Sequence, residues 1–199
     1  MNPAIENIIF DLGGVLYAVN YQKTHDYFAP YVTYNQTVQS KIFDLFETGY
    51  LSAGEFIKNL QQEYQLPFSA HEIIHGWNAM LSGLIPGRIK LIHELQSNYR
   101  LFLLSNTNEI HYQFIYKECE PLFNLFERCY FSHQIKLRKP NLDAFEYVLN
   151  ENDLSASKTL FVEDSPQHIE AARRLGLHTH FYQKDPEFLL LFEKFIKSA

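Results

Sequence analysis

The sequence predicts an α/β protein with a doubly wound parallel sheet, and two observations lead to this prediction. Five short runs are apolar throughout instead of alternating with polar residues, which is typical of parallel strands covered on both faces. Segments with helical periodicity precede the last four runs, and strands that alternate with helices at this spacing form right-handed β-α-β units. The five runs cover residues 7–11, 101–105, 129–132, 160–164 and 178–182.

Four segments between these runs place apolar residues at helical spacing. The last of them ends at Gly176, and a glycine just beyond a helix is a common C-terminal cap. We expect helices over residues 89–96, 109–126, 142–150 and 167–176.

The interval from 17 to 86 departs from this alternation. It contains no convincing strand, but capping boxes at Ser52–Glu55 and Ser69–Glu72 mark helix starts. We therefore expect an all-helical insertion over 17–86, placed within a core domain made of residues 1–16 and 87–199.

Composition excludes several classes of protein. The chain has 199 residues, 46% of them hydrophobic, and a net charge of -6 without any run of Lys or Arg, which argues against nucleic-acid binding. No stretch approaches the roughly 18 apolar residues of a membrane span, and the N-terminal apolar run stops too early, at Asp11, for a secretory signal. Cys119 and Cys129 are too few for a disulfide framework. We expect a cytoplasmic protein with free thiols.

Polar residues that end apolar runs are the candidates for chemistry, because ligands of open α/β sheets bind beyond the carboxyl ends of the strands. Asp11 ends the first run and is followed by two glycines, Ser105 ends the second, and Lys139 precedes a proline. Each has an ordinary alternative as a turn, cap or surface residue. The pair Glu163 and Asp164 ends a run expected to be buried, and adjacent buried carboxylates favour a cation such as Mg²⁺.

Taken together, four segments resemble the motifs of the haloacid dehalogenase-like hydrolase superfamily. They are FDLGGVL from Phe10, LLSNTN from Leu103, RKP from Arg138 and FVEDS from Phe161. The spellings DLGGVL and LSNTN, with GWNAML before the expected hinge at residues 85–87, are most similar to the branch with α-D-glucose-1-phosphate phosphatases. The 17–86 insertion resembles the helical cap of this superfamily.

This resemblance implies a Mg²⁺-dependent phosphomonoester hydrolase for a small molecule, with a sugar phosphate as the expected substrate. Asp11 would attack phosphorus and form an aspartyl-phosphate that water hydrolyses. Ser105, the Asn106 amide and Lys139 would bind the phosphoryl oxygens. The metal would be held by Asp11, the Gly13 carbonyl and Asp164, with Glu163 acting through water or from behind these ligands.

Gly13 departs from the pattern, since the superfamily usually has an aspartate there that protonates the leaving oxygen. Such general acid catalysis typically contributes ~10²–10⁴-fold. Its absence predicts slower turnover or a good leaving group, such as an anomeric sugar oxygen, and disfavours a phosphomutase. A degenerate core that binds phosphate ligands without turnover is the main alternative.

Two further points concern the 17–86 insertion. His71, Glu72 and His75 match the H-E-x-x-H pattern of zinc proteases, but the capping box already accounts for Glu72. Residues of the insertion are expected to select the substrate. The candidates are Asn20, His25, Trp77 and Asn78. Whether the protein is a monomer or a dimer is left open.

Overall fold

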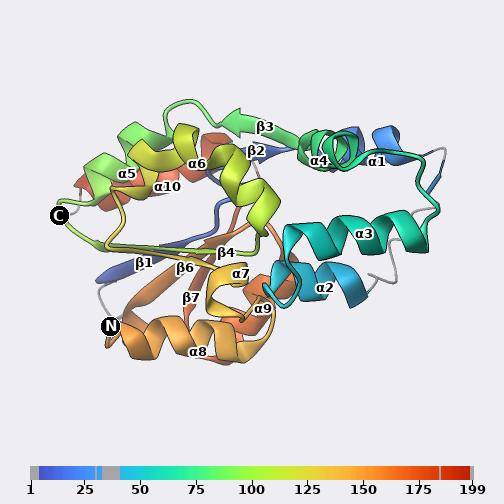
Figure 1. The fold of residues 1–199 in the computed structure, drawn as a ribbon. Helices are drawn as coiled ribbons and strands as arrows, with labels where there is room; N and C mark the ends of the chain where they lie inside the picture. Colours follow the sequence, from blue (N-terminus) through green and yellow to red (C-terminus); the bar gives the residue numbers. More distant parts are fainter. Residues whose placement is uncertain (1–4, 30, 33–40, 184, 198–199) are drawn as a thin grey trace.

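The computed structural model describes residues 5–29, 31–32, 41–183 and 185–197. Its centre is a five-stranded parallel sheet with the order β5-β4-β1-β6-β7 (Figure 1). The strand β1 lies between β4 and β6, so the chain builds the sheet first to one side of β1 and then to the other. All five predicted strands are confirmed to within a residue at each end: β1 (Asn7–Phe10), β4 (Arg100–Ser105), β5 (Arg128–Phe131), β6 (Thr159–Glu163) and β7 (His178–Phe181).

Helices cover both faces of the sheet, as the continuous apolar runs predicted. One layer holds α5 (Arg88–Leu95), α6 (Glu109–Phe123) and α10 (Asp185–Lys197), and the other holds α8 (Leu142–Glu151) and α9 (Pro166–Arg174) (Figure 1). The short α7 (Ser132–Ile135) follows β5, and a 3₁₀ turn, η1 (Ala156–Lys158), precedes β6. The four predicted helices are confirmed, whereas α10 was not foreseen.

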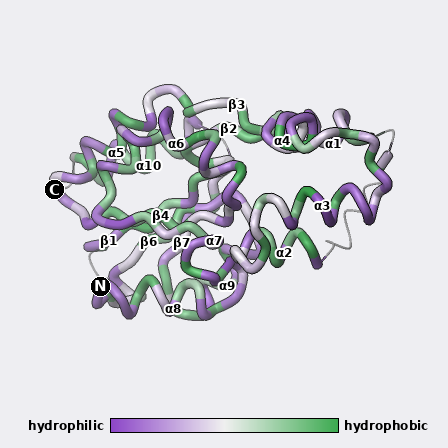
Figure 2. The backbone as a smooth tube through the Cα atoms, in the orientation of Figure 1, coloured by the Kyte–Doolittle hydropathy of each residue, from purple (hydrophilic) through white to green (hydrophobic). Residues whose placement is uncertain are grey.

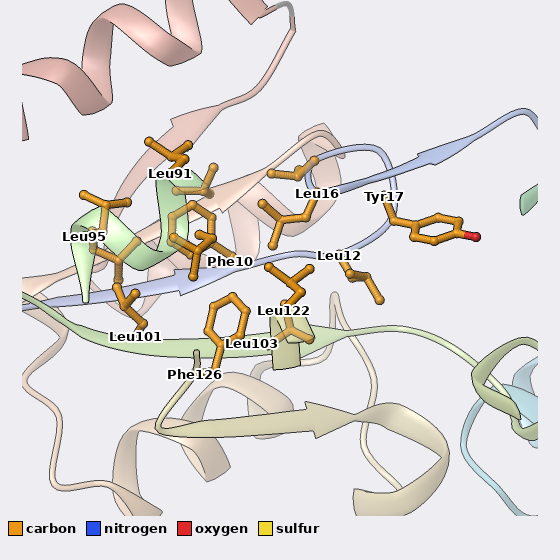
Figure 3. Close-up of a cluster of buried hydrophobic side chains, with 14 of the residues drawn as sticks. Phe10, Leu12, Leu16, Tyr17, Leu91, Leu95, Leu101, Leu103, Leu122 and Phe126 are labelled. Carbon is orange, nitrogen blue, oxygen red and sulfur yellow. The ribbon is translucent and has the colours of Figure 1, made fainter. Parts of the chain in front are cut away.

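Alternate side chains of the strands fill two separate hydrophobic clusters. Ile8 and Phe10 of β1 point into the cluster under α5, α6 and α10, and Ile9 points into the one under α8 and α9. All three side chains are fully buried. Figure 3 shows the first cluster around Phe10, and Figure 2 shows helix α8 alternating between hydrophobic and hydrophilic segments. The sheet is therefore the middle layer of a three-layer core.

The prediction that residues 17–86 contain no strand is wrong. The strands β2 (Tyr17–Val19) and β3 (Leu81–Leu84) form an antiparallel two-stranded ribbon. They escape detection because each has only three or four residues, and β3 contains a serine and Gly83, whose φ is +104°. Glu118 of α6 joins the ribbon to the core, accepting hydrogen bonds from the Tyr17 hydroxyl at 2.9 Å and the Leu84 N–H at 3.0 Å.

Beyond the ribbon, the described part of the insertion is helical, as predicted. It contains α1 (Tyr21–Phe28), α2 (Lys41–Glu47), α3 (Ala53–Glu63) and α4 (Ala70–Asn78), which we call the helical insertion. Both capping boxes are present, at the starts of α3 and α4. The helical insertion has its own hydrophobic cluster around Phe46 and Phe56, to which Ile110 of α6 also belongs. In the described part of the chain, every helix is too short or too polar to cross a membrane.

Candidate active site

Three charged side chains meet where the central strands end. Asp11 follows β1 directly, and its N–H donates to the Val162 carbonyl of β6 at 2.9 Å. Lys139 Nζ lies 2.6 Å from both Asp11 Oδ1 and Glu163 Oε2. All three residues are buried, with Lys139 and Glu163 at most 1% exposed. A single ammonium group therefore joins the carboxylates that follow β1 and end β6.

Asn106 fixes the backbone of this lysine. Its side-chain Nδ2 donates to the Lys139 carbonyl at 2.8 Å, and the Lys139 N–H donates to Asn106 Oδ1 at 3.0 Å. Ser105 precedes it at the end of β4 and is buried. The structure thus brings Ser105, Asn106 and Lys139 to one place. The sequence suggested a role only for the Asn106 backbone amide, and its side chain adds a positioning function that was not foreseen.

Three carboxylates gather around the one ammonium group. An oxygen from each of Asp11, Glu163 and Asp164 lies within 4.8 Å of the others. Burial, together with the charge of Glu163, raises the pKa of Asp11 to about 8. Burial and Glu163 likewise raise the pKa of Asp164 to about 7. The three carboxyl groups outnumber the one ammonium group, and such a cluster of oxygen donors fits a hard divalent cation.

Glu163 is held by donors on every side. Its Oε1 accepts from the N–H groups of Asp164 and Ser165, each at 3.1 Å, and its Oε2 accepts from Lys139 and from His168 Nδ1 at 2.9 Å. Although burial opposes it, these cationic and hydrogen-bonding partners lower the pKa of Glu163. An acid with so many partners is a rigid support for the loop that carries Asp164.

The loop after Asp11 is anchored by the core. Leu12 and Leu16 point into the hydrophobic cluster around Phe10 (Figure 3). Gly14 has a φ of +80°, and a Cβ atom there would overlap the carboxylate of Asp164. Gly13 has no such conflict, because a Cβ at this position would meet only Val19 Cγ2, at 3.4 Å. Gly14 is therefore required by its surroundings, whereas Gly13 is not.

The four candidate substrate-selecting residues lie in different settings. Asn20 caps α1 by accepting from the N–H two residues later, and His25 is exposed on the same helix. Trp77 stacks on His111 of α6, with ring centroids 5.3 Å apart. Asn78 is buried. Among the described residues, Trp77 Nε1 and Asn78 Oδ1 are buried without a hydrogen-bond partner. The role of all four in selecting a substrate stays a prediction.

The H-E-x-x-H segment gives no sign of a zinc site. Glu72 accepts from the N–H and the hydroxyl of Ser69, at 2.8 and 2.6 Å, as its capping box requires. His71 and His75 are exposed on α4. In the described part of the chain, metal-ligating side chains gather in a group of three or more at Asp11, Glu163 and Asp164.

Residues that the sequence did not point to lie on the insertion side of this site. Arg138, which precedes Lys139, pairs with Asp44 and with Glu47 of α2, the latter at 3.0 Å. Although 71% of the Tyr21 surface is exposed, partial burial and the charges of Asp11, Asp164 and Glu47 raise the pKa of its phenol. No local pattern marks these residues, because the helical insertion brings them to the site only in the folded chain.

A doubly wound sheet with a lysine-paired aspartate after its first strand and two acids at the end of β6 fits a class of hydrolases. The chain belongs to the haloacid dehalogenase-like hydrolase family, whose model matches residues 8–181. It is 28% identical over 186 residues to a D-ribitol-5-phosphate phosphatase of Bacteroides thetaiotaomicron, covering 88% of this chain and 90% of that protein. A sesquiterpene phosphatase, astK, of Aspergillus oryzae is 27% identical, with 85% of each chain covered.

Solved structures agree with this assignment. A haloacid dehalogenase family enzyme of Bacteroides thetaiotaomicron, in complex with magnesium and inorganic phosphate, has a TM-score of 0.83 and 27% identity. The match covers 94% of this chain and 99% of that one. A predicted hydrolase of the same family from Porphyromonas gingivalis has a TM-score of 0.85 and 27% identity, with 98% and 99% covered. The predicted fold class and family are confirmed.

Proposed function

We propose that this protein is a Mg²⁺-dependent phosphatase that hydrolyses a phosphomonoester of a small sugar or polyol. The observation that carries the proposal is the meeting of Asp11, Lys139 and the acidic pair at the end of β6, at the carboxyl edge of one sheet. The magnesium and phosphate bound by the solved relative support both the metal and the type of substrate.

In the proposed phosphoryl transfer, the residues of the site have different roles. Asp11 is the nucleophile and forms an aspartyl-phosphate, which splits one displacement into two easier ones. Lys139 holds its Oδ1, and Oδ2 would be the oxygen that attacks phosphorus. The Ser105 hydroxyl, the Asn106 N–H and Lys139 bind the phosphoryl oxygens, in a region where buried donors act strongly on developing charge.

The donor set fits magnesium. Asp11, the Gly13 carbonyl and Asp164 would hold the ion, and Glu163 would support Asp164 through the backbone bonds that it accepts. When bound, the ion would neutralise the surplus charge of these carboxylates and the charge of the phosphoryl group. The Gly14 position, where Asp164 packs against bare backbone, keeps this acid close to the loop after β1.

The substrate class follows from the insertion and from the relatives. We propose that residues 17–86 act as a cap that restricts the site to small molecules. The relative from Bacteroides thetaiotaomicron is named for D-ribitol-5-phosphate, a polyol phosphate, which supports this class here. The similarity to glucose-1-phosphate phosphatases noted in the sequence stays a prediction, as does substrate selection by Asn20, His25, Trp77 and Asn78.

Phosphate release from a panel of sugar and polyol phosphates, with and without Mg²⁺, tests this function. We expect turnover that requires Mg²⁺ and that Asp11→Asn abolishes, since the amide cannot act as the nucleophile. Phosphate binding by calorimetry in the same samples detects the competing module that binds without turnover. If the wild type binds phosphate but is as inert as Asp11→Asn on every ester, the chain is such a module and not a phosphatase.

A further inference from the structure

The proposed reaction lacks a proton donor on the loop that carries the nucleophile. Esters of ordinary alcohols release a basic oxygen, and a general acid typically accelerates such a step by ~10²–10⁴-fold. Gly13 has no side chain, and the space next to its Cα is limited by Val19 of β2. For such esters, a donor would have to come from another element near Asp11 and Lys139.

Glu47, the last residue of α2, lies beside the lysine loop. One of its oxygens, Oε2, is 3.0 Å from Nη2 of Arg138, the neighbour of Lys139. Asp44 of the same helix also pairs with Arg138 through a different nitrogen. Oε2 of Glu47 is shielded from solvent and, among the described residues, makes no well-aligned hydrogen bond. The ion pair thus holds a carboxyl group next to the segment that carries Lys139.

The charges around Glu47 suit a proton donor. Burial raises the pKa of Glu47 above its ordinary value, and the negative charge of Asp44 adds to this increase. The positive charges of Arg138 and Lys139 reduce the increase without cancelling it. The influence of Lys139 shows that Glu47 stands within the electrostatic range of the phosphate-binding lysine. The charges of Asp11 and Glu47 both raise the pKa of the Tyr21 phenol, so the two carboxyl groups act on one side chain.

We propose that Glu47 is the general acid and base that replaces the missing side chain at Gly13, a role that rests on the proposed phosphatase function. In the first step the bond from phosphorus to the ester oxygen breaks, a bond from phosphorus to Asp11 forms, and the proton of Glu47 passes to the departing alcohol. In the second step water adds to phosphorus, the bond to Asp11 breaks, and Glu47 takes the proton of the water.

Tyr21 is a weaker candidate for this role. Partial burial, together with the negative charges of Asp11, Asp164 and Glu47, raises the pKa of its phenol above the ordinary value, which makes proton release less favourable. Most of its side chain is also exposed to solvent. The carboxyl group of Glu47 is a far stronger acid than a phenol.

The chain provides a matched control for the test. Glu47→Gln and Asp44→Asn each remove one charged partner of Arg138, but only the first removes the proposed donor. For each variant we would measure kcat/KM with p-nitrophenyl phosphate, a good leaving group, and with a polyol phosphate, a poor one. The ratio of the two values is independent of the fraction of folded enzyme. Loss of a general acid is expected to lower the polyol-to-nitrophenyl ratio by about 100-fold or more in Glu47→Gln.

The same ratio should stay within about threefold of wild type in Asp44→Asn, since this change leaves the carboxyl group of Glu47 in place. Adding Gly13→Asp to Glu47→Gln should restore the hydrolysis of the polyol phosphate. The inference is wrong if Glu47→Gln lowers kcat/KM equally for both substrates, or if Asp44→Asn lowers the polyol-to-nitrophenyl ratio as much as Glu47→Gln does. In either case Glu47 only holds α2 against the core. A wild type inert on every ester overturns the phosphatase function itself, which separates that failure from the failure of Glu47 alone.

Discussion

Gly13 and Gly14 are neighbours of the same residue type, but only Gly14 is required by its surroundings. Its φ of +80° is costly for other residues, and any side chain there would collide with Asp164. The side chain of Asn106 also has a specific role, because its one amide group makes both of the hydrogen bonds that fix the Lys139 backbone. Single atoms at these positions help to fix where Lys139 and Asp164 lie.

Gly14→Ala should displace Asp164 and weaken Mg²⁺ binding, because the new methyl group would overlap the carboxylate. We expect the Kd for Mg²⁺, measured by calorimetry, to rise by about tenfold or more, a loss typical of disturbing a metal site. Gly13→Ala is the control, since its methyl group meets only Val19 at 3.4 Å. Equal affinities in the two variants would show that Asp164 does not bind the ion from this position.

At the scale of elements, Arg88 connects three parts of the molecule with one buried side chain. It begins α5, its Nε donates to the Val15 carbonyl at 2.9 Å, and its guanidinium pairs with Asp185 at the start of α10. The same group lies over the ring of Phe188, 4.3 Å from the centroid. The loop that follows Asp11 is therefore tied to two helices of the core.

Arg88→Met should destabilise the fold, because it keeps much of the volume but leaves the Val15 carbonyl without its donor. We expect a loss of about 2–4 kcal/mol in the free energy of unfolding, measured with urea. Lys90→Met on the same helix is the matched control, since Lys90 is 82% exposed and should change stability by about 0.5 kcal/mol or less. A similar loss in both variants would mean that α5 tolerates neither change and that the buried contacts of Arg88 are not special.

Whether a site residue could be predicted from the sequence depends on the element that carries it. Asp11, Ser105 and Glu163 could be found because each is a polar residue at the end of an apolar run, and parallel strands bring their carboxyl ends together. Glu47 and Arg138 could not, since their pairing depends on how the helical insertion packs on the core. The helix α10 was missed because its apolar residues run almost continuously, which hides the helical spacing of Phe188 and Phe192.

For the whole molecule, the cluster of Asp11, Glu163 and Asp164 makes the stability of the fold depend on pH and on metal binding. The pKa of Asp11 rises from 3.8 to about 8 on folding, so this residue stabilises the fold most at low pH. That contribution is lost as pH rises through the window from about 4 to about 8. The buried His111 acts in the opposite sense, because burial lowers its pKa to about 4 and its stabilising effect is lost as pH falls from about 6.5 to about 4.

Stabilisation by Mg²⁺ should therefore grow with pH. The ion competes with the protons on Asp11 and Asp164, whose pKa values are about 8 and about 7, so the increase in Tm on adding Mg²⁺ should be larger at about pH 8 than at about pH 6. Comparing Tm with and without the ion at each pH removes the contribution of the histidines. Asp11→Asn should show a smaller pH dependence, and an identical dependence in this variant would exclude Asp11 as the linked group.

The first turn of α6 has a consequence for the modularity of the fold. Glu109 accepts from the Ala53 N–H at 3.1 Å, Ile110 completes the hydrophobic cluster of the helical insertion, and His111 Nε2–H donates to the Trp77 carbonyl at 3.0 Å. Three consecutive residues of the catalytic core thus complete a unit that is distant from them in sequence. A chimaera that exchanges residues 17–86 with those of a relative must exchange 109–111 as well, because these three residues form part of the same packed surface.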